Sequence, residues 1–261
     1  MPPFWIVDAF TSRPFAGNPA AVVLMDQKYE DAWAQQVAAE FNLSETAFAR
    51  HLADHAGWEL RWFTPTTEVD LCGHATLATA HVLAGETSVG PLRFFTRSGE
   101  LVVTNTDGRY WMDFPSAAPV PADEPPSLAD ALGVKPVGVW SGATGDLLAE
   151  LPDAETVRDL TPDLALLKHI HARGVIVTAP GSPQYDFVSR FFAPSVGVPE
   201  DPVTGSAHTV LAPFWAERLE RSELLARQCS VRGGDVYLRL QTPGRVMIGG
   251  DAVTVMSGEL S

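Results

Sequence analysis

Short segments in which apolar and polar residues alternate recur along the whole chain, and this pattern is typical of strands buried on one face. Turn sequences such as Ser98-Gly99 and Asp107-Gly108 separate several of them. We therefore expect mostly antiparallel sheets. The predicted strands span residues 4–9, 20–24, 44–49, 58–63, 92–96, 99–105, 108–114, 137–141, 146–150, 174–178, 185–192, 235–241, 245–249 and 252–256.

Helical periodicity occurs in fewer places. Residues 31–41 place their large apolar side chains on one face, which predicts an amphipathic helix. Residues 75–84 and 207–218 are instead largely apolar on all sides, and a helix of that kind must be enclosed by other elements. We expect each sheet to curl around one of these two helices. Shorter helices are predicted at residues 127–132, 154–160 and 162–169.

A short motif occurs twice, each time at the start of one of the two apolar helices. The first copy reads Cys72-Gly73-His74-Ala75-Thr76, and the second reads Thr204-Gly205-Ser206-Ala207-His208. Similar strand sequences precede the two copies, at residues 61–65 and 190–194. A duplicated strand–loop–helix unit indicates two similar halves whose helix N-termini face one cleft. The unpaired N–H groups and the positive end of the helix dipole favour a carboxylate ligand there.

The chain of 261 residues is long enough for two domains of ordinary size. Five prolines between Pro115 and Pro126 mark the best candidate for a linker. We predict an α+β protein with two similar domains, residues 1–116 and 117–261, in which the last residues are able to pack back on the first domain. Each domain is expected to be a curled, mostly antiparallel sheet around a central apolar helix, with the active site in the cleft between the domains.

Composition argues against some classes of function. The formal net charge of -14 and the pI near 4.8 disfavour nucleic-acid binding, which needs clustered Lys and Arg. Cys72 and Cys229 provide no disulfide framework, so a reducing, cytoplasmic location is expected. The N-terminal residues lack the features of a signal peptide, and the longest uncharged apolar run, residues 71–85, is too short to span a bilayer. We expect a soluble protein that binds neither nucleic acid nor membrane.

Glu45 lies in the segment Asn42-Leu43-Ser44-Glu45-Thr46-Ala47-Phe48, which supports two interpretations. Asn42 and Glu45 have the spacing of a helix capping box, and the residues alone favour this interpretation. Residues 46–49 are, however, too few for the helix that such a box would begin. A Glu on a short strand between apolar neighbours would be partly desolvated, would hold its proton more readily and would suit proton transfer.

The polar residues around the two motifs are more numerous than helix packing requires. His74 is either a satisfied polar residue at a helix start or a proton donor to substrate. Asp201, in Asp201-Pro202-Val203-Thr204, fits either an Asx turn or a site residue beside the second motif. A thiol at a helix start, such as Cys72, ionises more readily than usual. A two-thiol racemase would nevertheless need a second cysteine at the position of Thr204.

Other polar residues give weaker indications. His51 and His55 have the i, i+4 spacing of metal ligands, but no Glu follows His51, and a solvated segment explains them better. None of the three lysines lies in a context that suggests catalysis, which disfavours a Schiff-base cofactor. The sequence contains no phosphate loop or dinucleotide fingerprint. The residues therefore indicate neither a metal site nor a Schiff-base or dinucleotide cofactor.

Several segments are specific in combination and in order, and they are residues 7–11, 15–22, 42–48, 63–65, 68–76, 201–208 and 248–250. Together they resemble the PhzF-like (phenazine biosynthesis) family, which is related to diaminopimelate epimerase and proline racemase. Residues 115–183 show no specific match. The resemblance implies two domains of the diaminopimelate epimerase-like fold with the site between them.

The resemblance also implies roles for individual residues. The best-studied member of the family isomerises a cyclohexadiene carboxylate by moving a proton without a cofactor, and its catalytic Glu, Asp and His fall on Glu45, Asp201 and His74. The related epimerases use two cysteines, whereas this chain pairs Cys72 with Thr204. A homodimer is expected from the family. The residues expected to bind substrate are Gly73, Cys72, Ser44, Thr204, Gly205, Ser206 and Asn18.

We therefore expect a cofactor-independent isomerase of a small carboxylate. Glu45 would move the proton, while His74 and Asp201 would assist its return or orient the substrate. The two helix starts would bind the carboxylate or a developing enolate. Three alternatives stay open: a racemase or epimerase that uses Cys72 with Glu45, a lyase or hydratase on the same scaffold, and a protein that binds a ligand or partner without turnover.

Overall fold

The chain forms two compact units. The computed structural model describes residues 1–53, 57–86, 90–241 and 244–261. Unit 1 comprises Met1–Asp113 together with Gly249–Ser261, and unit 2 comprises Phe114–Ile248. The boundary between Asp113 and Phe114 lies close to residue 116, and the last strand belongs to unit 1. Each unit combines many strands with few helices, as expected of the α+β class.

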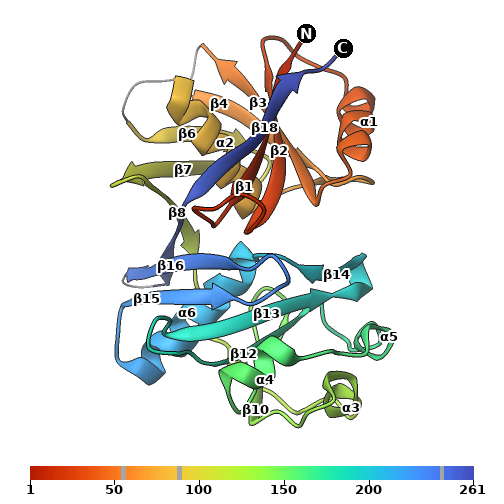
Figure 1. The fold of residues 1–261 in the computed structure, drawn as a ribbon, viewed down its shortest axis with the longest axis vertical. Coiled ribbons are helices and arrows are strands. Elements are labelled where there is room, and N and C mark those ends of the chain that lie inside the picture. The colour runs from red at the N-terminus through yellow and green to blue at the C-terminus, as the bar shows by residue number, and fades with distance from the viewer. Residues whose placement is uncertain (54–56, 87–89, 242–243) are drawn as a thin grey trace. The chain divides into compact units, whose positions relative to one another are not determined.

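The strands of unit 1 form one mixed sheet. They are β1 (Pro3–Ala9), β2 (Asn18–Met25), β3 (Glu45–Leu52), β4 (Gly57–Phe63), β5 (Glu68–Val69), β6 (Leu92–Thr96), β7 (Gly99–Thr106), β8 (Arg109–Pro115) and β18 (Ala252–Glu259). β1 pairs antiparallel with both β2 and β18, β2 pairs parallel with β3, and β3 pairs antiparallel with β4. β4 pairs antiparallel with β5 and parallel with β6, and β6 to β8 continue as a meander. Figure 1 shows the blue β18 beside the red β1, so strands from both ends of the sequence meet in this sheet.

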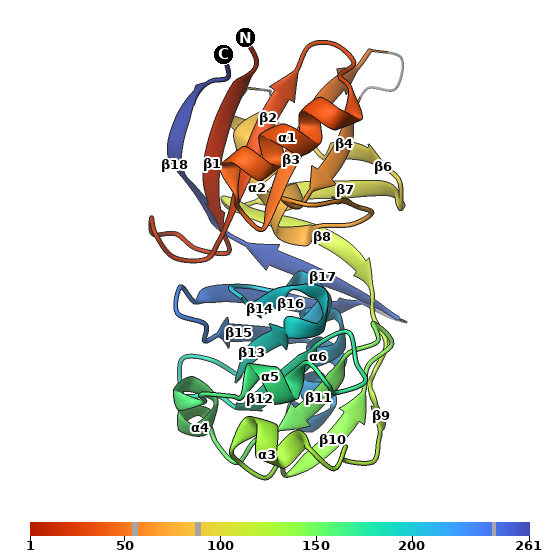
Figure 2. The ribbon, with the colours of Figure 1, turned by 90° about the vertical axis from the view of Figure 1, so that its right-hand side faces the viewer.

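Two helices pack on the sheet of unit 1, and they differ in character. Helix α1 (Asp31–Phe41) is amphipathic and lies across the sheet in Figure 2. Its buried Ala34 and Ala38 belong to an apolar cluster that includes Phe48 and Phe63. Helix α2 (Gly73–Glu86) contacts β1, β2, β3 and β18. Because its residues from His74 to Leu83 are buried except for His81, α2 is enclosed as its apolar sequence predicts.

Two threonines are fully buried within α2, and each satisfies its hydroxyl locally. Thr76 Oγ1 donates to the carbonyl of Cys72 at 2.6 Å, and Thr79 Oγ1 donates to the carbonyl of Ala75 at 2.7 Å. These bonds to the preceding turn remove the cost of burying an unpaired hydroxyl. The helix therefore tolerates polar residues on faces that contact the sheet.

The strands of unit 2 follow a related plan. They are β9 (Val120–Pro121), β10 (Gly138–Ser141), β11 (Leu147–Glu150), β12 (Val175–Pro180), β13 (Phe187–Ala193), β14 (Val198–Asp201), β15 (Glu223–Gln228), β16 (Gly234–Gln241) and β17 (Arg245–Gly250). β10 pairs antiparallel with β9 and β11, β11 pairs parallel with β12, and β12 pairs antiparallel with β13. β13 pairs antiparallel with β14 and parallel with β15, and β15 pairs antiparallel with β16.

Helix α6 (Gly205–Leu219) is the central helix of unit 2 and contains a proline. Pro213 has no N–H to donate to the carbonyl of Thr209 one turn earlier. Ser116 Oγ donates to that carbonyl instead, at 3.1 Å. The helix therefore continues past the proline. The shorter helices are α3 (Leu128–Leu132), α4 (Ala154–Asp159) and α5 (Leu164–Leu167), followed by a 3-10 turn at Pro194–Val196, and α4 and α5 contact β13 (Figure 2).

The duplicated motif corresponds to a duplicated topology. In unit 1, β4 pairs antiparallel with β5, helix α2 follows, and β6 returns parallel to β4. In unit 2, β13 pairs antiparallel with β14, helix α6 follows, and β15 returns parallel to β13. The predicted strand–loop–helix unit is therefore present in both units, each copy leading into a central helix.

Two details differ from the sequence-based expectations. The short strands β5, β9 and β14 and the longer β15 were outside the predicted set. The capping-box interpretation of Asn42 and Glu45 is wrong, because Asn42 ends α1 in the left-handed conformation (φ 52°) and Glu45 begins β3. Within the described residues, no helix combines the length and apolar character needed to cross a membrane.

Candidate active site

Three of the predicted site residues form one cluster in unit 1. Glu45 is the first residue of β3, while Cys72 and His74 flank the first residue of α2. His74 Nε2 lies 3.4 Å from Glu45 Oε2, and His74 Nδ1 lies 3.5 Å from Cys72 Sγ. The imidazole thus lies between a carboxylate and a thiol. All three are groups that exchange protons, so the cluster has the composition of a general acid–base site.

Burial controls the charge of His74. Its side chain is 7% exposed, and desolvation lowers its pKa to about 3. The ring is therefore neutral near pH 7, even though a carboxylate lies beside it. Nε2 makes no hydrogen bond to the described residues. The simple interpretation of His74 as a satisfied polar residue at a helix start does not account for this nitrogen.

The remaining predicted residues of unit 1 lie close to the cluster in sequence or across a strand pair. Ser44 directly precedes Glu45, and Gly73 is the first residue of α2, between Cys72 and His74. Asn18 is fully buried at the start of β2. β2 pairs parallel with β3 so that Ala20 lies opposite Glu45. Asn18 therefore belongs to the strand that neighbours the Glu45 strand.

A second cluster in unit 2 contains Asp201 and Thr204. Thr204 Oγ1 donates to Asp201 Oδ2 at 2.5 Å. The buried Gln228 ties the two residues together: its Nε2 donates to the Asp201 carbonyl at 2.7 Å, and its Oε1 accepts from the Thr204 N–H at 2.8 Å. Asp201 accordingly accepts from a side-chain hydroxyl.

The start of α6 carries the other predicted residues of unit 2. Thr204 is its N-cap and makes no side-chain capping hydrogen bond, and Gly205 is its first residue. Ser206 Oγ accepts a hydrogen bond from Arg173 Nη2 at 3.0 Å. His208 lies one turn into the helix, where Nδ1 donates to the Thr204 carbonyl at 2.7 Å and burial lowers the pKa of the ring to about 4. This second copy of the motif therefore also holds a neutral histidine, but in a different position.

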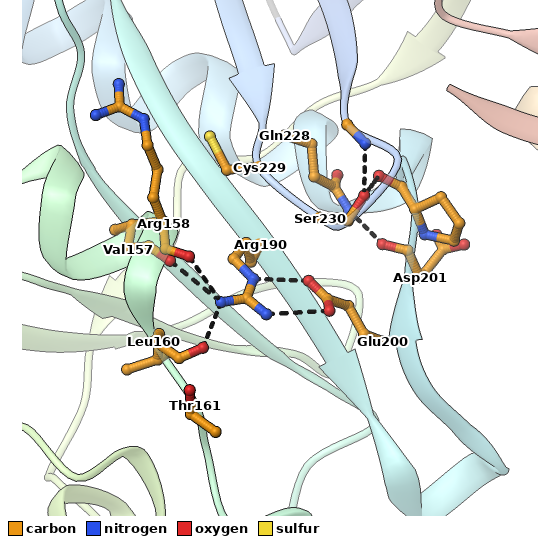
Figure 3. Close-up of polar contacts among 12 residues, drawn as sticks. Val157, Arg158, Leu160, Thr161, Arg190, Glu200, Asp201, Gln228, Cys229 and Ser230 are labelled. Atoms are coloured by element: carbon orange, nitrogen blue, oxygen red, sulfur yellow. Dashed lines mark hydrogen bonds and ion pairs between the residues drawn. The ribbon is translucent and has the colours of Figure 1, made fainter. Parts of the chain in front are cut away.

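A bidentate ion pair precedes the central helix in each unit. In unit 1, Nε and Nη2 of Arg61 donate to the two carboxylate oxygens of Glu68 at 2.7 and 2.8 Å. In unit 2, the same atoms of Arg190 donate to Glu200 at 2.7 and 3.0 Å (Figure 3). Each guanidinium also lies about 5 Å from the phenylalanine ring two residues later in its own strand. The Arg-x-Phe sequence of β4 and β13 thus carries the same interaction twice.

Arg190 also satisfies backbone groups of a neighbouring segment. Its Nη1 donates to the carbonyls of Val157, Arg158 and Leu160, at the end of α4 (Figure 3). Because Glu200 directly precedes Asp201, the pair fixes the backbone from which the Asp201 side chain projects. The arginine thereby links α4 to the loop that leads into α6.

Metal binding is one possible use of the cluster in unit 1. Glu45, Cys72 and His74 each offer a ligand atom within 4.8 Å of the others. The two contacts of His74 involve opposite ring nitrogens, however, and one ion binds only one of them. The observed arrangement therefore suits proton movement better than coordination. Of the other candidate ligands, His51 packs edge-on against Trp58, and His55 lies outside the described residues.

Two polar residues that contact the predicted site had not been singled out from the sequence. Gln228 ends β15, a strand that the pattern did not predict, and Arg173 lies in the segment without a specific match. Neither lies in a motif, so only proximity in the folded chain reveals them. The concavity lined by Gly181, Tyr185 and Arg221 contains none of the predicted site residues.

Comparison with known proteins supports the resemblance seen in the sequence. The family profile of phenazine biosynthesis-like proteins matches residues 7–258. An uncharacterized isomerase of Pseudomonas aeruginosa is 51% identical, and the alignment covers 98% of this chain and 97% of that protein. The crystal structure of a PhzF family protein from Enterococcus faecalis has 45% identity and a TM-score of 0.95, with 100% of this chain and 99% of that chain covered.

A more distant structure shows the wider fold. A hydroxyproline epimerase from Agrobacterium vitis is 10% identical and has a TM-score of 0.61, over 98% of this chain and 91% of that chain. This likeness, together with the closer relatives, confirms the diaminopimelate epimerase-like fold. The chain belongs to the phenazine biosynthesis-like family, and it is an enzyme of the isomerase class.

Proposed function

We propose that the enzyme moves a proton on a small carboxylate substrate by general acid–base catalysis, without a cofactor. The observation that carries the proposal is the contact between Glu45 and His74. The Glu45 side chain is 21% exposed, whereas the imidazole is buried and neutral. A neutral ring does not neutralise the carboxylate as an imidazolium would. Glu45 is therefore suited to take a proton from a carbon acid and return it.

The cluster in unit 2 is proposed to bind and orient the same substrate. Thr204 and Gln228 hold Asp201, and the first turn of α6 presents backbone N–H groups that suit an anionic oxygen. Such donors stabilise the enolate that forms when a carbon beside a carboxylate loses its proton. The joint action of the two clusters on one substrate is part of the proposal.

Deuterium incorporation tests the proposal directly. The protein is incubated in heavy water with small unsaturated, 2-amino and 2-hydroxy carboxylates, and the products are analysed by mass and proton spectra. Label that enters one compound with the wild type and not with Glu45→Gln supports the proposal. Equal labelling by both proteins contradicts the role of Glu45. A product that differs from its substrate by the mass of water indicates a lyase or hydratase.

A second candidate function is an epimerase in which Cys72 takes part. It is supported by the 3.5 Å contact between Cys72 Sγ and His74 Nδ1, because this contact places a second group that exchanges protons in the same cluster as Glu45. Cys72→Ala distinguishes the two candidates. The substitution abolishes turnover if the thiol is the acid or base, and merely slows it if Glu45 performs the transfer.

A further inference from the structure

Arg173 connects the start of α6 to a part of the chain that has no recognisable motif. Its Nη2 donates to Ser206 Oγ at 3.0 Å and also donates to Asp146 Oδ2. Ser206 lies next to Gly205 in the second motif and is a predicted substrate-binding residue. A cationic side chain therefore contacts the proposed binding site from outside the motif.

Several contacts fix the orientation of the guanidinium. Nε donates to the carbonyl of Thr144 at 3.2 Å, and the group lies 5.4 Å from the ring of Phe191. The Asp146 side chain is 0% exposed and accepts a second hydrogen bond from Thr144 Oγ1 at 2.6 Å. A buried carboxylate is costly without a charged partner, so Asp146 needs this arginine and holds it in place.

The chemistry of arginine decides the direction of the hydrogen bond between Arg173 and Ser206. An arginine can only donate, so Ser206 Oγ is the acceptor, and the hydroxyl keeps its own hydrogen. Among the described residues, Ser206 Oγ donates to no acceptor. Ser206 is half-buried rather than enclosed, and the Arg173 side chain is 40% exposed. The hydroxyl is thus left as a donor to a group that comes from solvent.

We propose that Arg173 is a positioning residue that orients Ser206 as a hydrogen-bond donor to the carboxylate of the substrate. The inference rests on the proposed function. Asp146 holds the Arg173 guanidinium in place, and Arg173 orients the Ser206 hydroxyl by donating to its oxygen. The oriented hydroxyl then donates preferentially to an anionic acceptor. A hydrogen bond from a donor polarised by a cation is stronger to a carboxylate than to a neutral amide. This chain of contacts therefore makes the site prefer an acid over the corresponding amide.

The experiment compares the binding of benzoate and benzamide, two planar probes of the same size, by isothermal titration calorimetry. The wild type is expected to bind benzoate at least about tenfold more tightly than benzamide, as one hydrogen bond to a charged group provides. Ser206→Ala and Arg173→Lys should both reduce this ratio by about tenfold. The lysine keeps a positive charge beside Asp146, so this variant is expected to fold. Its ammonium lacks the planar fork by which one guanidinium donates to both Asp146 and Ser206.

A double variant and a control make the result specific. Ser206→Ala combined with Arg173→Lys should reduce the ratio no further than either change alone, because both remove one interaction. Arg239→Met removes an exposed arginine of unit 2 that pairs with Glu223 and should leave the ratio unchanged. A wild type that does not prefer benzoate, or an Arg173→Lys variant that keeps the wild-type ratio, would overturn the proposal.

The role of Arg173 can be separated from the proposed reaction with Glu45→Gln. This variant should lose deuterium exchange but keep the preference for benzoate, because Glu45 lies in the other cluster. For a substrate found by exchange, Arg173→Lys should raise KM by about tenfold and change kcat little. Loss of the benzoate preference in Arg173→Lys without any exchange by the wild type would support the binding role and contradict the proposed reaction. Deuterium exchange by the wild type, together with a KM of Arg173→Lys equal to that of the wild type, would support the proposed reaction and contradict the role of Arg173.

Discussion

His74 Nε2 lies 3.4 Å from Glu45 Oε2, although the two residues come from the start of a helix and the start of a strand. The chain brings them together because β3 borders the enclosed helix α2, and the two elements are in contact. Burial keeps the ring neutral, so the pair is a carboxylate beside an uncharged imidazole. The chemical consequences of this pairing can be measured.

Glu45→Gln should abolish most proton exchange while leaving the fold intact. The amide has nearly the same shape as the carboxylate, but it cannot accept a proton. General acid–base catalysis contributes about 10²- to 10⁴-fold, so we expect a loss of that size in the rate of deuterium incorporation. Thermal unfolding of the variant serves as the control for folding. A variant with wild-type exchange rates would remove Glu45 from the mechanism.

Cys72→Ala should slow the reaction by about tenfold or less, which corresponds to about 1.4 kcal/mol in the barrier. The thiol contacts His74 Nδ1, so its removal changes the environment of the ring but leaves the contact with Glu45. Cys229→Ala, which removes the other free thiol, is the matched control. Complete loss of exchange in Cys72→Ala alone would instead identify the thiol as an acid or base.

The stability of the protein should fall as the pH falls from about 6.5 towards 4. Burial lowers the pKa of His74 to about 3 and that of His208 to about 4, while the unfolded chain has ordinary histidines near 6.5. Between these values the unfolded state binds more protons than the folded state. Each of the two histidines therefore contributes stability that is present above pH 6.5 and is lost as the pH falls, by up to about 1.4 kcal/mol per pH unit.

Urea unfolding at several pH values measures this effect, and single variants assign it. His74→Asn and His208→Asn should each reduce the slope of unfolding free energy against pH between 6.5 and 5. The asparagine variants are compared by slope rather than by absolute stability, because each substitution also changes packing. A slope that is the same in the wild type and in both variants would show that neither histidine is kept neutral by burial.

Arg190→Met should destabilise the protein by about 3 kcal/mol or more. The substitution leaves Glu200 without its bidentate partner and removes the donor to three backbone carbonyls at the end of α4. Arg239→Met is the control, because Arg239 and Glu223 form an exposed pair of the kind that contributes less than about 1 kcal/mol. Similar losses of unfolding free energy in both variants would contradict the structural role of Arg190.

The parts of the fold that follow from periodicity could be predicted from the sequence. Helix α1 spans the same residues as the amphipathic pattern, and the two apolar helices are enclosed because nothing else satisfies their faces. The motif repeat also indicated the repeated topology. Short strands such as β5 and β14 escaped prediction, because two to four residues carry no measurable period and form only against a neighbouring strand.

Some residues of the candidate site could likewise be predicted from the sequence, and others could not. Glu45, Cys72 and His74 lie in motifs, and the folded chain brings these three together. Gln228 and Arg173 act on the second motif from distant positions in the sequence. Nothing in their local sequence distinguishes them from other polar residues. Their importance depends on which strand and loop ends meet the start of α6, and that is decided by tertiary packing.

The position of β18 in the sheet has a consequence for synthesis. β18 covers one side of β1, and it is made only after the whole of unit 2. Unit 2 is one continuous segment and can finish folding on the ribosome, since domains generally fold as units. Until residues 252–259 emerge, the nascent chain holds β1 as an uncovered sheet edge of the kind that pairs with other chains. A message cut short before codon 252 would therefore yield a complete second unit attached to an aggregation-prone first one.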